Sequence, residues 1–279
     1  MMTMIERAWL WLIQRRRIVQ ATSALLFNSY VTQQVTKGLP CPAMNCYACP
    51  ASAFACPIGT IQHFIGRRKF PLYTLGVIGL VGALIGRASC GWFCPFGWFQ
   101  ELMYKLPVRK WPMPNRFNWT RYVILATLVV VIPWISHEPW FCKLCPVGSL
   151  EASIPLALLS ADIRALIGGF YALKVSILAA FLIWMSKTQR PFCRWVCPLG
   201  ALWSPFNPWS TFRLAVDESR CIQCERCFQV CPVEIHVYQE PNSGACIRCM
   251  RCVQACPVSC ITVTSPGWSL ESDRNVEQV

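Results

Sequence analysis

The sequence predicts a membrane all-α fold with four transmembrane helices, followed by a small α+β domain at the C-terminus. Of the 279 residues, 54% are hydrophobic and only 14% are charged, which is unusual for a soluble domain of this size. The apolar residues gather into segments of membrane length, whereas the chain from residue 217 onward is polar. The nineteen cysteines recur at fixed spacings in both parts.

Four apolar segments approach the length that a helix needs to cross a bilayer, namely residues 18–35, 72–88, 122–135 and 165–185. The first contains Gln20, Asn28 and Gln33, so one side of it must face protein. The chain does not open with a basic stretch, a short apolar run and a small-residue cleavage site. We therefore expect the first segment to remain as an anchor.

The lysine and arginine residues beside these segments predict the orientation in a bacterial inner membrane. They cluster before the first span and after the second and fourth, which places the N-terminus and the C-terminal domain in the cytoplasm. Arg67, Arg68 and Lys69 on the outer side go against this rule. Because the basic residues flank apolar segments and form no single stripe, the net charge of +13 indicates anionic lipid and not nucleic acid.

The composition divides the chain into three parts. Residues 1–216 are predicted to form the four-span domain, residues 217–268 the soluble domain, and residues 269–279 a tail with little apolar content that we expect to be disordered.

Two cysteine runs define the C-terminal domain. Both follow the spacing C-x2-C-x2-C-x3-C-P, which is typical of bacterial ferredoxins, and the fourth cysteine of each run reaches the cluster of the other. The runs therefore predict a bacterial-type 2[4Fe-4S] ferredoxin-like domain that relays single electrons. One cluster is expected on Cys221, Cys224, Cys227 and Cys256, and the other on Cys246, Cys249, Cys252 and Cys231.

Zinc is the alternative that the two runs disfavour, because zinc motifs join one close cysteine pair to a distant second pair. Cys260 lies outside both runs and is expected to be a buried thiol without a ligand role.

A second signature, Cys-Pro-x-Gly, occurs at residues 56–59, 94–97, 145–148 and 197–200. It stands before and after the second span and again before and after the fourth, so these two spans resemble parallel copies of one unit. At the inner face the copies supply four thiols, Cys90, Cys94, Cys193 and Cys197, which predict a third cluster. The alternative there is four unligated thiols.

At the outer face more cysteines are present than one cluster needs. A fourth cluster would take four ligands from Cys46, Cys49, Cys56, Cys142 and Cys145, or would use Cys41. Disulfides are the alternative in that compartment.

Over almost its whole length the sequence resembles the NapH-type membrane ferredoxins, a family that includes a relative from methylamine utilisation. The resemblance rests on residues 45–50 and 55–59, on both C-x3-C-P pairs and on the paired ferredoxin runs. It implies a quinol dehydrogenase component that passes electrons from membrane quinol to a periplasmic ferredoxin-type or cytochrome partner within a multi-subunit complex. Related proteins of metalloenzyme biogenesis share the C-x3-C-P pairs.

A quinol site needs a hydrogen-bonding or titratable group beside an apolar slot. Lys174 in the fourth span is one candidate, because an intramembrane charge is a functional hypothesis by default. Its alternative role is to pair with another helix. His137 in an outer loop and Glu101 after the inner signature are the other candidates. No C-x-x-C-H and no dinucleotide fingerprint is present, so covalent haem and nicotinamide find no support.

The sequence thus predicts a membrane iron–sulfur protein that oxidises quinol and passes the electrons to a periplasmic partner. One alternative is an assembly factor that supplies electrons to a metalloenzyme during maturation. Another is that only the two C-terminal clusters are redox-active and the membrane cysteines are structural.

Overall fold

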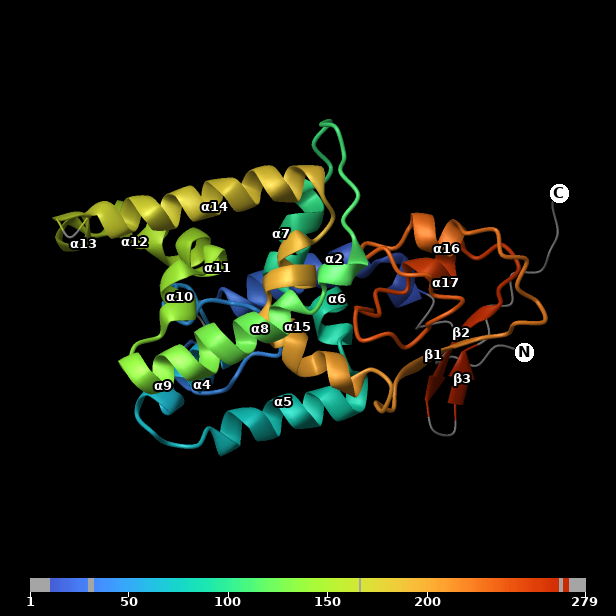
Figure 1. Cartoon of the computed structure of the whole chain (residues 1–279), viewed down its shortest axis with the longest axis horizontal. Helices are drawn as coiled ribbons and strands as arrows, with labels where there is room; N and C mark the ends of the chain where they lie inside the picture. Colours follow the sequence, from blue (N-terminus) through green and yellow to red (C-terminus); the bar gives the residue numbers. More distant parts are fainter. Residues whose placement is uncertain (1–10, 30–32, 166, 266–267, 271–279) are drawn as a thin grey trace.

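The computed structural model describes residues 11–29, 33–165, 167–265 and 268–270. These residues form a mostly helical structure with one small sheet near the C-terminus. Figure 1 shows two long helices, α5 (Leu72–Ile85) and α14 (Gly169–Lys187), on opposite sides of a core of short helices. The sheet and the cysteine-rich loops lie together at one end.

Among the described residues, two helices are long and apolar enough to cross a membrane. Asn115–Ser136, which comprises η1 (Asn115–Phe117), α8 (Thr120–Ile124), η2 (Leu125–Val131) and α9 (Ile132–Ser136), has 22 residues, and α14 has 19. At a rise of 1.5 Å per residue they are about 33 and 29 Å long, close to the thickness of the hydrocarbon core. Only 17% of the most apolar window of each is buried, so most of this apolar surface is exposed, which is consistent with membrane association. They cover the third and fourth predicted spans.

The first and second predicted spans form shorter helices. The second forms α5, whose 14 residues extend about 21 Å. The first forms α2 (Arg16–Phe27), which ends where the side chain and backbone N–H of Asn28 both donate to the carbonyl of Ala24. Residues 30–32 lie outside the described ranges, and α3 (Gln33–Thr36) follows them. Gln20 is buried and donates to the carbonyl of Gly91, so α2 faces protein on its polar side.

Each Cys-Pro-x-Gly signature begins a helix. Proline occupies the first helical turn because its fixed φ suits this position and its missing N–H is not needed there. These helices are α4 (Pro57–Gly66), α7 (Pro95–Met103), α11 (Pro146–Gly148) and α15 (Pro198–Trp203). The cysteine before each proline is therefore held at a helix N-terminus.

Short helices connect these elements. They are α6 (Ala88–Trp92), α10 (Trp140–Leu144), η3 (Ser149–Ser153), α12 (Ile154–Leu159), α13 (Ala161–Ala165), η4 (Phe192–Val196) and η5 (Ser204–Phe206). The core between them contains buried aromatic side chains, among them Phe96, Phe192 and Trp203, together with the membrane-domain cysteines.

The C-terminal part contains two one-turn helices, α16 (Arg226–Gln229) and α17 (Arg251–Ala255), and an antiparallel sheet. The strands β1 (Arg213–Val216), β2 (Ile261–Ser265) and β3 (Trp268–Leu270) lie in the order β1-β2-β3, and Leu214 pairs with Val263. Strand β1 precedes residue 217, the predicted start of the soluble domain. The predicted tail begins within β3, and residues 271–279 lie outside the described ranges.

Candidate iron–sulfur centres

The C-terminal cysteines form two groups. Cys221, Cys224, Cys227 and Cys256 line one cavity. Cys231, Cys246, Cys249 and Cys252 lie near one another, and burial, followed by the neighbouring thiols of Cys249, Cys246 and Cys231, raises the pKa of Cys252. We call these the distal and proximal ferredoxin sets.

The two cysteine loops have the same backbone conformation. Gln223 and Glu225 have φ values of 52° and 56°, and the equivalent Arg248 and Met250 have 49° and 61°. These left-handed residues turn the loop around the enclosed space, and the N–H of Arg248 points to the sulfur of Cys246 at 3.4 Å. Cys260 is buried, lines the distal cavity and has its sulfur 3.4 Å from that of Cys256.

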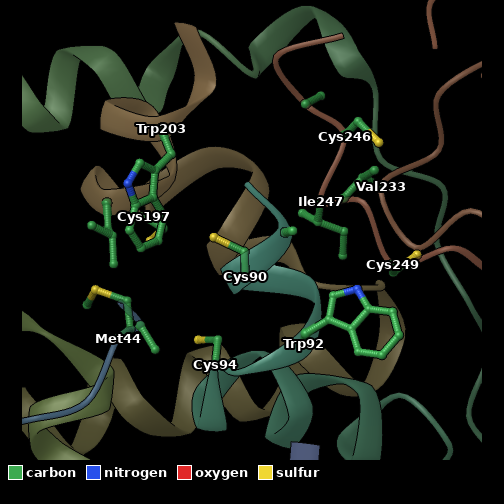
Figure 2. Close-up of a cluster of buried hydrophobic side chains, with 14 of the residues drawn as sticks. Met44, Cys90, Trp92, Cys94, Cys197, Trp203, Val233, Cys246, Ile247 and Cys249 are labelled. Atoms are coloured by element: carbon green, nitrogen blue, oxygen red, sulfur yellow. The ribbon is translucent and has the colours of Figure 1, made fainter. Parts of the chain in front are cut away.

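The four cysteines expected at the inner face are Cys90, Cys94, Cys193 and Cys197, and we call them the inner set. Burial, then the neighbouring Cys193 and Cys90, raises the pKa of Cys94 to about 12. Figure 2 shows the side chains of Cys90, Cys94 and Cys197 directed toward a common space beside Met44. The N–H groups of Gly97 and Gly200 donate to the sulfurs of Cys94 and Cys197 at 3.3 and 3.4 Å.

Two buried arginines tie the copies of the inner set to each other. Arg87 stands three residues before Cys90, and its guanidinium donates to the carbonyl of Cys193 at 3.3 Å. Arg190 stands three residues before Cys193, and its guanidinium donates to the carbonyl of Cys90 at 2.6 Å. A Cβ atom on Gly200 would meet Arg87, and one on Gly97 would meet Arg190. The glycine of the signature is therefore needed to admit the arginine of the other copy.

Four of the six cysteines that the sequence offers for an outer-face cluster share one cavity, and we call these four the outer set. Cys46, Cys56, Cys142 and Cys145 line one cavity, which Tyr47 and Phe141 also border. Cys49 is turned toward Asn28, with its sulfur 3.9 Å from the side-chain oxygen. Cys41 is buried, and its N–H donates to the carbonyl of Ala55. No cysteine of the chain forms a disulfide, and all nineteen lie in the described ranges.

A glutamine links the two halves of each membrane set. Gln62 stands six residues after Cys56, donates to the sulfur of Cys142 at 3.1 Å and accepts from the N–H of Phe141. Gln100 stands six residues after Cys94, donates to the sulfur of Cys193 at 3.0 Å and accepts from the N–H of Phe192. The two sets therefore share one design. These glutamines and the paired arginines were not predicted, although the repeats C-P-x-G-x2-Q and R-x2-C mark them in the sequence.

The cysteine sets suit polynuclear iron–sulfur clusters better than single ions. Within the described ranges, no three Cys, His, Asp or Glu side chains converge closely enough to hold one metal ion. Four thiols around a cavity, with N–H groups donating to their sulfurs, match a bridged cluster instead.

The three candidate quinol residues lie in separate surroundings. The ammonium of Lys174 donates to the hydroxyl of Ser153 at 2.6 Å, so the lysine joins α14 to η3. His137 has a φ of 59° and its Nδ1 lies 2.6 Å from the carbonyl oxygen of Gly66. Of the three, only Glu101 adjoins a cysteine set.

Glu101 is the centre of an ion-pair cluster. Its carboxylate lies 2.6 Å from Arg16, 2.6 Å from Arg190 and 2.7 Å from Arg251. Burial alone would raise its pKa, but the three arginines outweigh this and lower the pKa to about 2. Glu101 thus connects α2, α7, the segment before η4 and α17.

One partly buried acid was not predicted. Glu151 in η3 accepts a hydrogen bond from the backbone N–H of Cys46 at 2.6 Å. Burial raises the pKa of Glu151 to about 7. No sequence motif marks it, since only the fold brings residues 46 and 151 together.

A family model described as "4Fe-4S binding domain" matches residues 53–73, 70–114, 118–152 and 170–214, which is more than half of the chain. The chain belongs to this 4Fe-4S binding family. The match contains the inner set and three of the four cysteines of the outer cavity. The family assignment therefore includes the chain before strand β1, which we call the membrane part. A second model, "4Fe-4S dicluster domain", matches residues 213–257.

Proteins from several organisms resemble the chain. An uncharacterized protein of Methanocaldococcus jannaschii is 32% identical, over 66% of this chain and 76% of its own length. The ferredoxin-type protein NapH of Escherichia coli is 29% identical, over 59% of this chain and 54% of its own length. The methylamine utilization ferredoxin-type protein MauN of Methylorubrum extorquens is 31% identical, over 54% of this chain and 49% of its own length. No solved structure matches the chain. The protein is therefore a ferredoxin-type electron-transfer protein, distantly similar to NapH and MauN.

Proposed function

We propose that this 4Fe-4S protein oxidises membrane quinol and passes the electrons to a redox partner outside the cytoplasm. The observation that carries the proposal is the succession of four cysteine sets along the molecule, outer, inner, proximal and distal. When bound, a [4Fe-4S] cluster at each set would accept and release one electron. The residues of the chain supply the thiols, exclude water and hold the sets close together.

The outer and inner sets are connected through Cys41. This buried thiol lies within electrostatic range of Cys56 of the outer set and Cys94 of the inner set, and together with burial both raise its pKa. Met44 lines the outer cavity and also borders the inner set (Figure 2). The protein between the two sets is therefore only one or two side chains thick.

The inner and proximal sets are connected by direct backbone contact. The indole N–H of Trp92, two residues after Cys90, donates to the carbonyl of Arg248 at 2.9 Å. Figure 2 shows Cys249 beside Trp92. Arg87, which binds the carbonyl of Cys193, also donates to the carbonyl of Gly244 at 2.8 Å. These contacts place the inner set next to the proximal set, and the distal set lies beyond it.

We infer the location of this electron path in the membrane from the four predicted spans. Four spans would place the protein in a bacterial inner membrane, with the N-terminus and the ferredoxin sets in the cytoplasm. The outer set would then face a periplasmic ferredoxin-type or cytochrome partner in a multi-subunit complex. The similarity to ferredoxin-type proteins, one of them named for methylamine utilization, supports a role in electron transfer.

The experiment that tests the proposal measures iron, acid-labile sulfide and EPR signals on anaerobically purified protein after addition of a reduced quinol analogue. About sixteen irons per chain, with clusters reduced by quinol in seconds, are expected. About eight irons and no response to quinol would confine the chemistry to the ferredoxin sets and refute the proposal. Full iron content with reduction only over many minutes would favour the assembly-factor alternative.

A further inference from the structure

A pocket opens where the membrane part meets the ferredoxin part, by which we mean residues 213–270. It lies between α7, α17, the N-terminal end of α2 and the segment before η4, and has a volume of about 210 Å³. Arg17, Trp98, Tyr104, Lys105, Gln189 and Arg251 line it. The volume suits one substituted aromatic ring, and Trp98 and Tyr104 offer it apolar faces.

Gln189 supplies an unused hydrogen-bond acceptor in this pocket. Its side-chain oxygen is buried and has no hydrogen-bond partner among the described residues. An unsatisfied buried acceptor costs free energy, which a ligand hydroxyl would recover by donating to it. The carboxylate of Glu101 in the wall is already paired with three arginines, so the oxygen of Gln189 is the acceptor that a ligand can use. A neutral ring that bears hydroxyl groups fits the aromatic faces and this acceptor.

The pocket wall contacts two cysteine sets. Arg190, which follows Gln189, donates to the carbonyl of Cys90 of the inner set at 2.6 Å. Arg251 stands between Cys249 and Cys252 of the proximal set. Glu101 binds both arginines, so a ring in the pocket would be separated from each set by about one layer of side chains.

We propose that this pocket binds the headgroup of membrane quinol, an inference that rests on the proposed function and gives it a location. Oxidation of one quinol to quinone breaks two O–H bonds and releases two protons and two electrons. Two one-electron acceptors are needed, and clusters held by the inner and proximal sets would be the oxidants. The protons leave to water at the mouth, where Arg17 and Lys105 are exposed. Leu102, 48% exposed at the rim, offers the isoprenoid tail an apolar exit.

Gln189 is inferred to position the ring by accepting from one hydroxyl. Gln189→Leu removes this acceptor at nearly constant volume, and its expected effect is about a tenfold loss of quinone affinity. Gln239→Leu is the matched control, because Gln239 is an exposed glutamine of the ferredoxin part that does not line the pocket. Iron content and melting temperature verify that both variants fold and load.

The experiment labels the intact, cluster-loaded protein in nanodiscs with a photoreactive azidoquinone and identifies the labelled peptides by mass spectrometry. Labelling within residues 98–105 or 187–191, reduced about tenfold in Gln189→Leu and unchanged in Gln239→Leu, is expected. Labelling elsewhere, or equal labelling of both variants, would overturn the inference even where quinol reduces the clusters. Specific labelling of the pocket without cluster reduction by quinol would support the site and refute the proposed turnover.

An anionic lipid headgroup is the other ligand that the cations of the pocket would attract. Vesicles with phosphatidylglycerol would then protect the pocket from the azidoquinone, and Lys105→Gln would abolish this protection. That result would overturn the inference. Equal labelling in nanodiscs of neutral lipid and of phosphatidylglycerol supports it.

Discussion

Gly91 lies directly against the backbone carbonyl of Ile247, so that a Cβ atom at residue 91 would overlap the carbonyl oxygen. Gly91 follows Cys90 of the inner set, and Ile247 follows Cys246 of the proximal set. Backbone of the membrane part therefore lies against backbone of the ferredoxin part at the point where electrons would cross.

Gly91→Ala is expected to separate the inner and proximal sets. The added methyl group must displace the Ile247 carbonyl, which costs about 1–3 kcal/mol of unfolding free energy. EPR spectra of the reduced protein should show a weaker magnetic interaction between the two clusters. Gly79→Ala in α5 is the control, since its Cβ would meet nothing within 4 Å and would stabilise the helix by about 0.5–1 kcal/mol. Equal effects of both substitutions would contradict the close contact.

Glu101→Gln is expected to destabilise the protein by about 3–5 kcal/mol, because three arginines, two of them buried, would lose their counter-charge. Glu138→Gln is the matched control: Glu138 pairs with Lys143 at 2.6 Å, but the pair is exposed and contributes less than about 1 kcal/mol. Thermal unfolding of both variants measures the difference. Similar losses would show that the arginines find other partners.

The low pKa of Glu101 predicts that the stability of the folded protein depends on pH. The pKa of this carboxylate is lowered in the folded protein from 4.5 to about 2, so its stabilising contribution is complete above about pH 4.5 and is lost as the pH falls toward 2. Unfolding of the cluster-free protein across this range should show a steeper loss of stability for the wild type than for Glu101→Gln. Parallel curves would contradict the low pKa.

Serine substitutions should identify the outer ligands. Cys56→Ser removes a thiol from the outer cavity and should lower iron content by about four atoms per chain. Cys49→Ser should leave iron content unchanged, because Cys49 does not line that cavity and is turned toward Asn28. Iron and sulfide analysis distinguishes the two. Iron loss in Cys49→Ser with none in Cys56→Ser would exchange their roles.

Gln100→Leu is expected to lower the reduction potential of the inner cluster. The N–H of Gln100 donates to the sulfur of Cys193, and such a bond stabilises the more negative, reduced state. A net contribution of about 1 kcal/mol corresponds to about 40 mV for one electron. Gln62→Leu should do the same at the outer cluster. Potentiometric titration followed by EPR measures both shifts, and unchanged potentials would show that these bonds do not tune the clusters.

The sequence could predict the cysteine sets because ligand spacing is local. The ferredoxin runs and the C-x3-C-P pairs fix which thiols are close along the chain, and the structure brings the expected inner and C-terminal sets together. Which outer thiols share a cavity depends on how residues 41–56 fold back on residues 142–145. No spacing rule contains that information.

The contacts between the copies could not be predicted for the same reason. Arg87 reaches the carbonyl of Cys193, more than a hundred residues away, and neither residue marks the other in the sequence. The length of α2 was also missed: Asn28 leaves the helical conformation, and its side chain and backbone N–H both donate to the carbonyl of Ala24 at the end of the helix. The apolar pattern to residue 35 does not reveal this.

A cluster bound by the inner set would also influence the folding of the protein. The thiols of this set come from two segments about 100 residues apart, so a cluster bound there would act as a covalent cross-link that closes a long loop, as a disulfide of similar span does at roughly 4–5 kcal/mol. Delivery of iron and sulfide would then complete folding of the membrane part only after residue 197 has been synthesised. Oxidative loss of that cluster would release the two halves from each other and expose buried arginines, which would make the damaged protein a substrate for proteolysis.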